Sequence, residues 1–194
     1  MRRQTINRHT KETEIMLDFT IDGSGNSNIN TGVGFFDHML TLMTKHGLFD
    51  LNLTCNGDLA VDQHHSVEDI GIALGQAFST SLGNKEGITR YATTTTPMDE
   101  SLSTLSLDIS GRSYFVFNVE GLKDKVGNFD TELVEEFFQA FVSNANVTLH
   151  INLAYGKNTH HIIESIFKGF GRVLDQASQL NPRIKGVPST KGTL

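Results

Sequence analysis

The chain has 194 residues, a formal net charge of −6, and 38% hydrophobic and 20% charged residues. This composition is typical of a globular protein with a sizeable core, and its acidic balance argues against binding to nucleic acid or to an anionic membrane surface. The single cysteine, Cys55, excludes an internal disulfide and favours the cytoplasm, and we find neither a signal peptide nor an apolar run of membrane-spanning length.

The first part of the chain predicts two strands and two helices. Alternating apolar residues predict strands at 14–22 and 49–55, whereas apolar residues at helical spacing predict a helix over 33–45. A longer helix should begin at Asp62, whose side chain can cap its first turn. This helix should end near residue 82, with Gly83 in the C-terminal cap.

The second part of the chain predicts four strands and two helices by the same two patterns. The predicted strands cover residues 88–96, 103–109, 113–119 and 147–153, and the predicted helices cover residues 131–144 and 158–179. Residues 183–194 have no periodic pattern and should form a loop-like tail.

A His-His-x-x-Glu motif follows a helix-capping residue in two places, 96 residues apart. The first His and the Glu of each motif stand at i and i+4, so they share one helix face and can bind one metal ion. These pairs are His64 with Glu68 and His160 with Glu164. One such motif could simply be a solvated helix start, but its repetition favours a metal site.

The second His of each motif, His65 or His161, should serve a different ion. Adjacent residues on a helix diverge by about 100°, so the two imidazoles of a pair point away from each other. A local two-fold axis, within one chain or between neighbouring chains, would let each helix contribute to both ions. The two expected sites are then His64, Glu68 and His161, and His160, Glu164 and His65.

The repeat extends beyond the motif, because residues 46–53 align with residues 144–151 at an offset of 98. The same offset places His38 opposite Glu136. We therefore expect residues 1–194 to form a single catalytic domain made of two fused homologous halves, about 1–87 and 88–194. Strands paired beside half-buried helices predict an α+β fold, a two-layer sandwich in which each half reads strand, strand, helix, strand, helix.

Ordered motifs cover nearly the whole chain and together resemble one enzyme family. They include Phe36-Asp37-His38-Met39-Leu40, residues 62–69, Met98-Asp99-Glu100, Ser110-Gly111-Arg112, residues 158–164 and Pro188-Ser189-Thr190-Lys191-Gly192. This set resembles imidazoleglycerol-phosphate dehydratase of histidine biosynthesis. The resemblance implies a fold like domain 2 of ribosomal protein S5 and a homo-oligomer of roughly 24 subunits with active sites between them.

The resemblance also implies the reaction and the cofactor. A manganese-dependent carbon–oxygen lyase of this kind converts imidazole glycerol phosphate to imidazole acetol phosphate and water. Two Mn²⁺ ions per active site, or other divalent metals, would stabilise the substrate's imidazolate while a proton is transferred. Neither a nucleic acid nor a membrane is an expected partner.

Roles carried over by this resemblance fall into three groups. The implied metal ligands are His38, His64, His65, Glu68, His160, His161 and Glu164. Glu12 would transfer a proton beside the substrate. The implied substrate-binding residues, which mainly hold the phosphate, are Arg90, Arg112, Lys168, Ser189 and Lys191.

Glu136 departs from the family, in which many relatives have a metal-binding His at this position. Because the repeat pairs it with His38, we expect Glu136 to bind the metal of His64, Glu68 and His161 or to orient a water on it.

Two other functions also fit a metal site with basic residues. A dinuclear phosphoester hydrolase would share both features, but it normally requires a carboxylate that bridges two close metals. A metal-assembled structural oligomer would not need Glu12, Arg90, Arg112 and Lys191 together.

Overall fold

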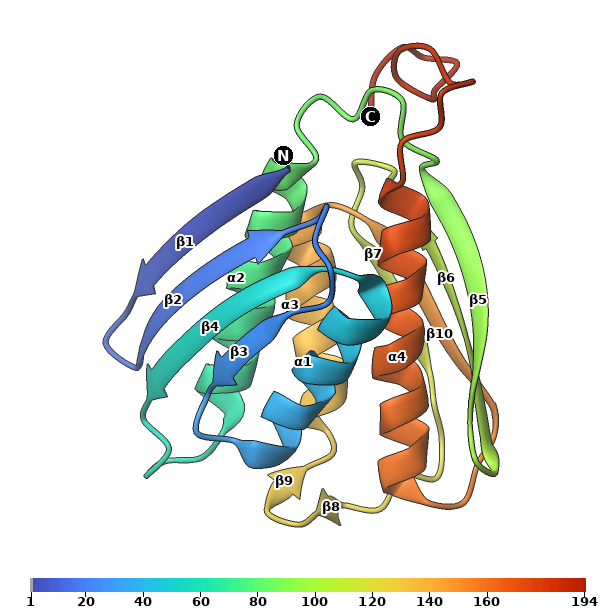
Figure 1. The fold of residues 1–194 in the computed structure, drawn as a ribbon. Coiled ribbons are helices and arrows are strands. Elements are labelled where there is room, and N and C mark those ends of the chain that lie inside the picture. The colour runs from blue at the N-terminus through green and yellow to red at the C-terminus, as the bar shows by residue number, and fades with distance from the viewer. Residues whose placement is uncertain (1) are drawn as a thin grey trace.

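In the computed structural model, which describes residues 2–194, four helices lie between two four-stranded sheets (Figure 1). The first sheet contains β1 (Arg3–His9), β2 (Thr13–Thr20), β3 (Ser27–Asn30) and β4 (Asp50–Gly57). The second contains β5 (Tyr91–Met98), β6 (Ser101–Asp108), β7 (Tyr114–Asn118) and β10 (Thr148–Tyr155). The helices are α1 (Gly34–Gly47), α2 (His64–Ser81), α3 (Leu133–Ala145) and α4 (Thr159–Ser178).

The two sheets have the same topology. Their strand orders are β1-β2-β4-β3 and β5-β6-β10-β7, and in each the last pair of strands is parallel whereas the others are antiparallel. The predicted α+β fold of two homologous halves is therefore confirmed. Each half has three strands of its four-stranded sheet before its first helix, however, so the expected order of strand, strand, helix, strand, helix was one strand short.

All four helices run in the same direction, and their N-terminal ends lie together at the lower end of Figure 1. Helix α1 packs against α4, and α2 packs against α3, so the contacts cross from one half to the other. Two glycines allow the helices to approach closely. A Cβ atom at Gly75 of α2 would lie 2.6 Å from the carbonyl oxygen of Phe141, and a Cβ atom at Gly171 of α4 would lie 2.2 Å from the carbonyl oxygen of Met43. The two contacts are equivalent in the repeat. They bring the N-terminal end of α1 beside that of α4, and the N-terminal end of α2 beside that of α3 (Figure 1).

The missed strands lack a clear apolar pattern. Edge strand β1 alternates between exposed and half-buried residues and includes Arg3 and Arg8, whereas β3 has Ile29 as its single apolar residue. Two-residue strands β8 (Lys125–Val126) and β9 (Phe129–Asp130) form a small ribbon that the sequence did not predict either. Strand pairing, and not local hydrophobicity, creates these elements.

Two predicted boundaries illustrate how backbone conformation sets the ends of elements. Strand β5 begins at Tyr91 and not at Ile88, because Arg90 has a left-handed backbone with φ of +82° and Ile88 forms only an isolated bridge with Leu180. Helix α2 begins two residues after Asp62, although the Asp62 carboxylate still accepts the His64 N–H. Gly83, with φ of +59°, follows the end of α2 as predicted.

The core between the sheets is rich in aromatic side chains from α3 and α4. Phe138 and Phe141 each pack edge-on against Phe170, with ring centroids 4.9 Å apart. All three rings are fully buried, which fixes α4 against the rest of the second half. Among residues 2–194, no helix combines the length and the apolar composition that a membrane crossing requires.

Candidate metal centre and active site

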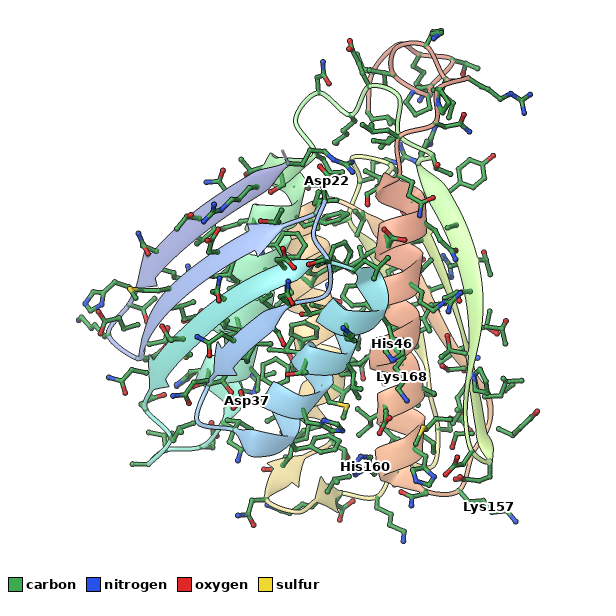
Figure 2. All side chains as sticks on the ribbon, viewed as in Figure 1. Asp22, Asp37, His46, Lys157, His160 and Lys168 are labelled. Atoms are coloured by element: carbon green, nitrogen blue, oxygen red, sulfur yellow. The ribbon has the colours of Figure 1, made fainter. Side chains whose placement is uncertain are left out.

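His38 of α1 meets His160 and Glu164 of α4 at the shared N-terminal end of these helices. Figure 2 labels His160 at the lower end of α4. The potential ligand atoms of the three residues all lie within 4.8 Å of one another. The Glu164 Oε2 atom is 3.2 Å from His160 Nε2 and 3.8 Å from His38 Nε2. The parallel packing of α1 and α4 therefore joins a motif pair to a His from the other half.

The carboxylate of this group is buried, with a side-chain exposure of 9%, and Lys168 Nζ lies 2.5 Å from Glu164 Oε1. Burial alone would raise the pKa of Glu164, but the hydrogen bond and charge of Lys168, with the two imidazoles, lower it overall. The carboxylate is thus held ionised. Phe35 packs its ring against His160 at a centroid distance of 5.2 Å and shields one side of the group.

This donor set fits a divalent metal ion. Two imidazole nitrogens and one carboxylate oxygen are common ligands of zinc, manganese and iron, and three ligands leave positions open for a substrate. His65, which we expected at this site, is not among the residues that the structure brings together here. It lies at the start of α2 in the same chain.

The corresponding pair on α2 is more open. His64 Nε2 and Glu68 Oε2 are 3.9 Å apart, as the i and i+4 spacing requires, but the Glu68 side chain is 45% exposed. Within residues 2–194, no third ligand atom joins this pair at metal-binding distance. Both Glu136 and His161 were expected here, and the single chain does not bring either of them to the pair.

The second His of each motif is held by a carboxylate from a neighbouring loop. His65 Nδ1 lies 2.9 Å from Asp58 Oδ2, and His161 Nδ1 lies 2.7 Å from Glu100 Oε2. These hydrogen bonds raise the pKa of both imidazoles above the ordinary value of 6.5. No role was predicted for Asp58 or Glu100 from the sequence, although Glu100 lies in the Met98-Asp99-Glu100 motif.

Glu12 lies in the hairpin between β1 and β2, next to the first motif. Its Oε1 atom is 3.8 Å from His65 Nε2, and its carbonyl oxygen accepts the Asp58 N–H at 3.0 Å. The Glu12 N–H donates to Thr10 Oγ1, which fixes the hairpin turn. The carboxylate, half exposed, therefore stands where a substrate bound beside His65 could exchange a proton with it.

A partly buried ion pair attaches this hairpin to α2. Arg8 Nη2 lies 2.7 Å from Asp69 Oδ1, and the Thr13 hydroxyl donates to Asp69 Oδ2 at 2.5 Å. Asp69 directly follows the motif residue Glu68 in the sequence. The hairpin that carries Glu12 is thus anchored to the helix that carries His64 and His65.

Most of the predicted phosphate-binding residues lie far from the metal group. Arg90 donates to Asp108 and to the Pro188 carbonyl oxygen, and its own N–H bonds to Ala177 near the C-terminal end of α4. At a helical rise of about 1.5 Å per residue, Ala177 is about 25 Å from His160. Arg112 is exposed on the loop before β7, and Ser189 and Lys191 lie in the C-terminal tail. Lys168 is the exception because it contacts Glu164.

Comparison with known proteins gives a consistent result. A family model for imidazoleglycerol-phosphate dehydratase matches residues 31–174. The chain is 66% identical over 194 residues to the imidazoleglycerol-phosphate dehydratase of Oceanobacillus iheyensis, covering 100% of both chains. It is 58% identical to that of Acetivibrio thermocellus, covering 100% of this chain and 99% of the relative.

Solved structures agree with this relationship. The crystal structure of imidazoleglycerol-phosphate dehydratase from Staphylococcus aureus has a TM-score of 0.84 and 46% identity, with 92% of this chain and 99% of that chain covered. A structure from Pyrococcus furiosus also has a TM-score of 0.84, at 36% identity, covering 97% of this chain and 100% of that chain. The chain therefore belongs to the imidazoleglycerol-phosphate dehydratase family.

Proposed function

We propose that the chain catalyses the dehydration of imidazole glycerol phosphate to imidazole acetol phosphate in histidine biosynthesis, as a manganese-dependent carbon–oxygen lyase. The observation that carries this proposal is the His38, His160 and Glu164 group with Lys168 beside it. Family membership supports the same substrate and reaction. An imidazole ring is a natural ligand for a metal held by His and Glu, because it is itself the side chain of histidine.

The reaction removes a C–H proton and the neighbouring hydroxyl, and the resulting enol becomes a ketone when a proton returns to carbon. When bound, two divalent cations supply Lewis acidity that favours the ionised form of the substrate's imidazole. Glu12 moves the proton, since its carboxylate stands on the Nε2 side of His65, whereas Asp58 is bound to Nδ1. Lys168, next to Glu164, and the basic residues of the tail region hold the phosphate and so fix the orientation of the substrate.

We further infer that the complete site forms between copies of the chain. The distance of about 25 Å along α4 separates Arg90 and the tail from His160, so one chain cannot bring both to a small substrate. A neighbouring copy that presents its tail to the metal end would complete the site. The same arrangement would supply His65 and His161 to the two ions, in a homo-oligomer of roughly 24 subunits.

An assay with imidazole glycerol phosphate and Mn²⁺ tests the proposed function against both alternatives. Formation of the ketone supports the dehydratase. Release of inorganic phosphate would instead identify a phosphoester hydrolase, and absence of any product would leave a metal-assembled structural oligomer.

Glu136 is expected to take part in the second metal site. The packing of α2 on α3 repeats that of α1 on α4, and the repeat gives Glu136 the same position on α3 that His38 has on α1. Its carboxylate does not reach His64 and Glu68 within the single chain, so its participation is a proposal about the assembled protein. Glu136→Ala should then weaken Mn²⁺ binding at one of two sites by at least about tenfold, because even the loss of a residue that only hydrogen-bonds to a ligand typically has an effect of this size. Glu136→His should restore it.

Calorimetric titration with Mn²⁺ measures this effect, with Glu135→Ala as the control in the same helical turn. Glu135 is exposed and is not expected to bind metal. Two intact sites in Glu136→Ala would show that the residue is a bystander.

A further inference from the structure

We propose that Asp58 and Glu100 are positioning residues that fix the orientation and the tautomer of His65 and His161. Each would hold Nδ1 of its imidazole as a donor, so that Nε2 keeps a lone pair for a metal ion. This inference rests on the proposed metal-dependent function, and it gives a role to two carboxylates that the reaction itself does not use.

Glu100 is held from two directions. Its Oε2 atom lies 2.7 Å from His161 Nδ1, and its Oε1 atom accepts the backbone N–H groups of Asn158 at 2.7 Å and Lys157 at 3.2 Å. Those two amides belong to the turn that leads into α4. The carboxylate therefore links the β5–β6 hairpin to the start of α4, which prevents it from rotating away from the imidazole.

Asp58 makes the corresponding contact in the first half. Both of its carboxylate oxygens lie near His65 Nδ1, at 2.9 and 3.2 Å, and its backbone N–H donates to the Glu12 carbonyl oxygen. Asp58 lies in the loop just after β4, so the rigid end of the sheet positions it. The same loop thus fixes both the imidazole and the hairpin that carries Glu12.

The hydrogen bond determines which nitrogen is available. An ionised carboxylate is only an acceptor, so the imidazole nitrogen that faces it must carry a proton. In a neutral imidazole the other nitrogen, Nε2, then has the free lone pair that a metal needs. Within residues 2–194, neither His64 nor His160 has a protein hydrogen bond at Nδ1, so these carboxylates serve the second His of each motif specifically.

The second His has a physical reason to need such support. The first His shares a helix face with the Glu at i+4, and this pairing already orients it. His65 and His161 lack such a partner, because the Asp69 carboxylate at i+4 from His65 binds Arg8 and Thr13 instead, and the residue at i+4 from His161 is Ser165. A carboxylate from outside the helix replaces it.

The two carboxylates come from different places in the repeat. Asp58 follows β4, whereas the turn between β10 and α4 is two residues shorter and has no carboxylate. Glu100 lies in the β5–β6 hairpin, at the position that the strand registers make equivalent to Glu12 in the first half. Each half therefore builds the same His–carboxylate bond from a different position, which favours selection for the bond over simple inheritance of the repeat.

Mn²⁺ titration of the assembled protein tests the proposal. Asp58→Ala and Glu100→Ala should each weaken binding at one of two sites by about 10- to 100-fold, as is typical for outer-shell partners. Asp58→Asn and Glu100→Gln, whose amide oxygens still accept the Nδ1–H, should recover part of the affinity. Glu86→Gln, an exposed carboxylate at a distant loop, is the control and should not change it.

The visible absorption spectrum of Co²⁺-loaded protein adds a readout that a purely structural role would not move. A changed ligand geometry should shift the Co²⁺ bands in the two alanine variants, while the particle size and melting temperature stay unchanged. Unaltered Mn²⁺ affinity and Co²⁺ spectra in both alanine variants would overturn the proposal. If these variants do not assemble, unaltered values in the two amide variants would overturn it equally, since an amide is a weaker acceptor.

These readouts need no substrate. Absence of dehydratase activity in the wild-type protein would therefore refute the proposed reaction and leave the metal titration interpretable.

Discussion

Glu12→Gln should preserve metal and substrate binding but lower turnover by about 100- to 10,000-fold, the usual contribution of a general acid–base group. The amide has the shape of the carboxylate but cannot accept and return a proton. The hairpin should keep its position, because it is held by Arg8, Asp69 and Thr13 and not by the Glu12 side chain. The loss should therefore appear in kcat and not in KM.

Steady-state kinetics with imidazole glycerol phosphate, together with Mn²⁺ titration, measure this outcome. Glu14→Gln is a matched control, since Glu14 is an exposed carboxylate on the strand that follows the same hairpin. Near-normal turnover of Glu12→Gln would remove Glu12 from the reaction. A large rise in KM with unchanged kcat would assign it to substrate binding instead.

Removal of the metal should abolish activity and loosen the assembly. If neighbouring copies supply ligands to one ion, a chelator removes contacts between chains as well as the cofactor. His64→Ala, and likewise the alanine variants of His65, His160 and His161, should lose tight binding at the site concerned, because a tetrahedral or octahedral centre tolerates the loss of a ligand poorly.

Size-exclusion chromatography with and without chelator, combined with metal analysis, measures both effects. His150→Ala provides a control, because His150 lies on β10 away from the ligand group. An unchanged particle with unchanged metal content in His64→Ala would exclude the two-site arrangement.

The sequence predicted those parts of the fold in which one face is fully buried. Strand β4 and helices α1 and α4 have regular apolar patterns, and their predicted ranges differ from the observed ones by only a few residues. By contrast, β1 and β3 are edge strands with few apolar residues, so their existence depends on pairing with β2 and β4. Local periodicity does not contain this information.

In the candidate site, too, the sequence predicts contacts within one helix but not contacts between separate elements. The i and i+4 spacing of His160 and Glu164 follows from helix geometry, so the sequence alone predicts their proximity. That His38 joins them depends on how α1 packs on α4, and the resemblance to the family supplied it. Asp58 and Glu100 could not be assigned from the sequence because each lies in a loop or turn, and its contact with an imidazole on a helix depends on tertiary packing.

Co-assembly of two damaged variants tests whether the active site is shared between neighbouring chains. Lys168→Met changes the metal end of α4, whereas Lys191→Met changes the tail, and each should be nearly inactive alone. If these lysines reach one site from different chains, random co-assembly of equal amounts leaves about one quarter of the sites with both lysines. Dehydratase activity in the mixed particle should then rise well above that of either variant. Activity that stays at the level of the separate variants, in particles shown to contain both chains, would contradict a shared site.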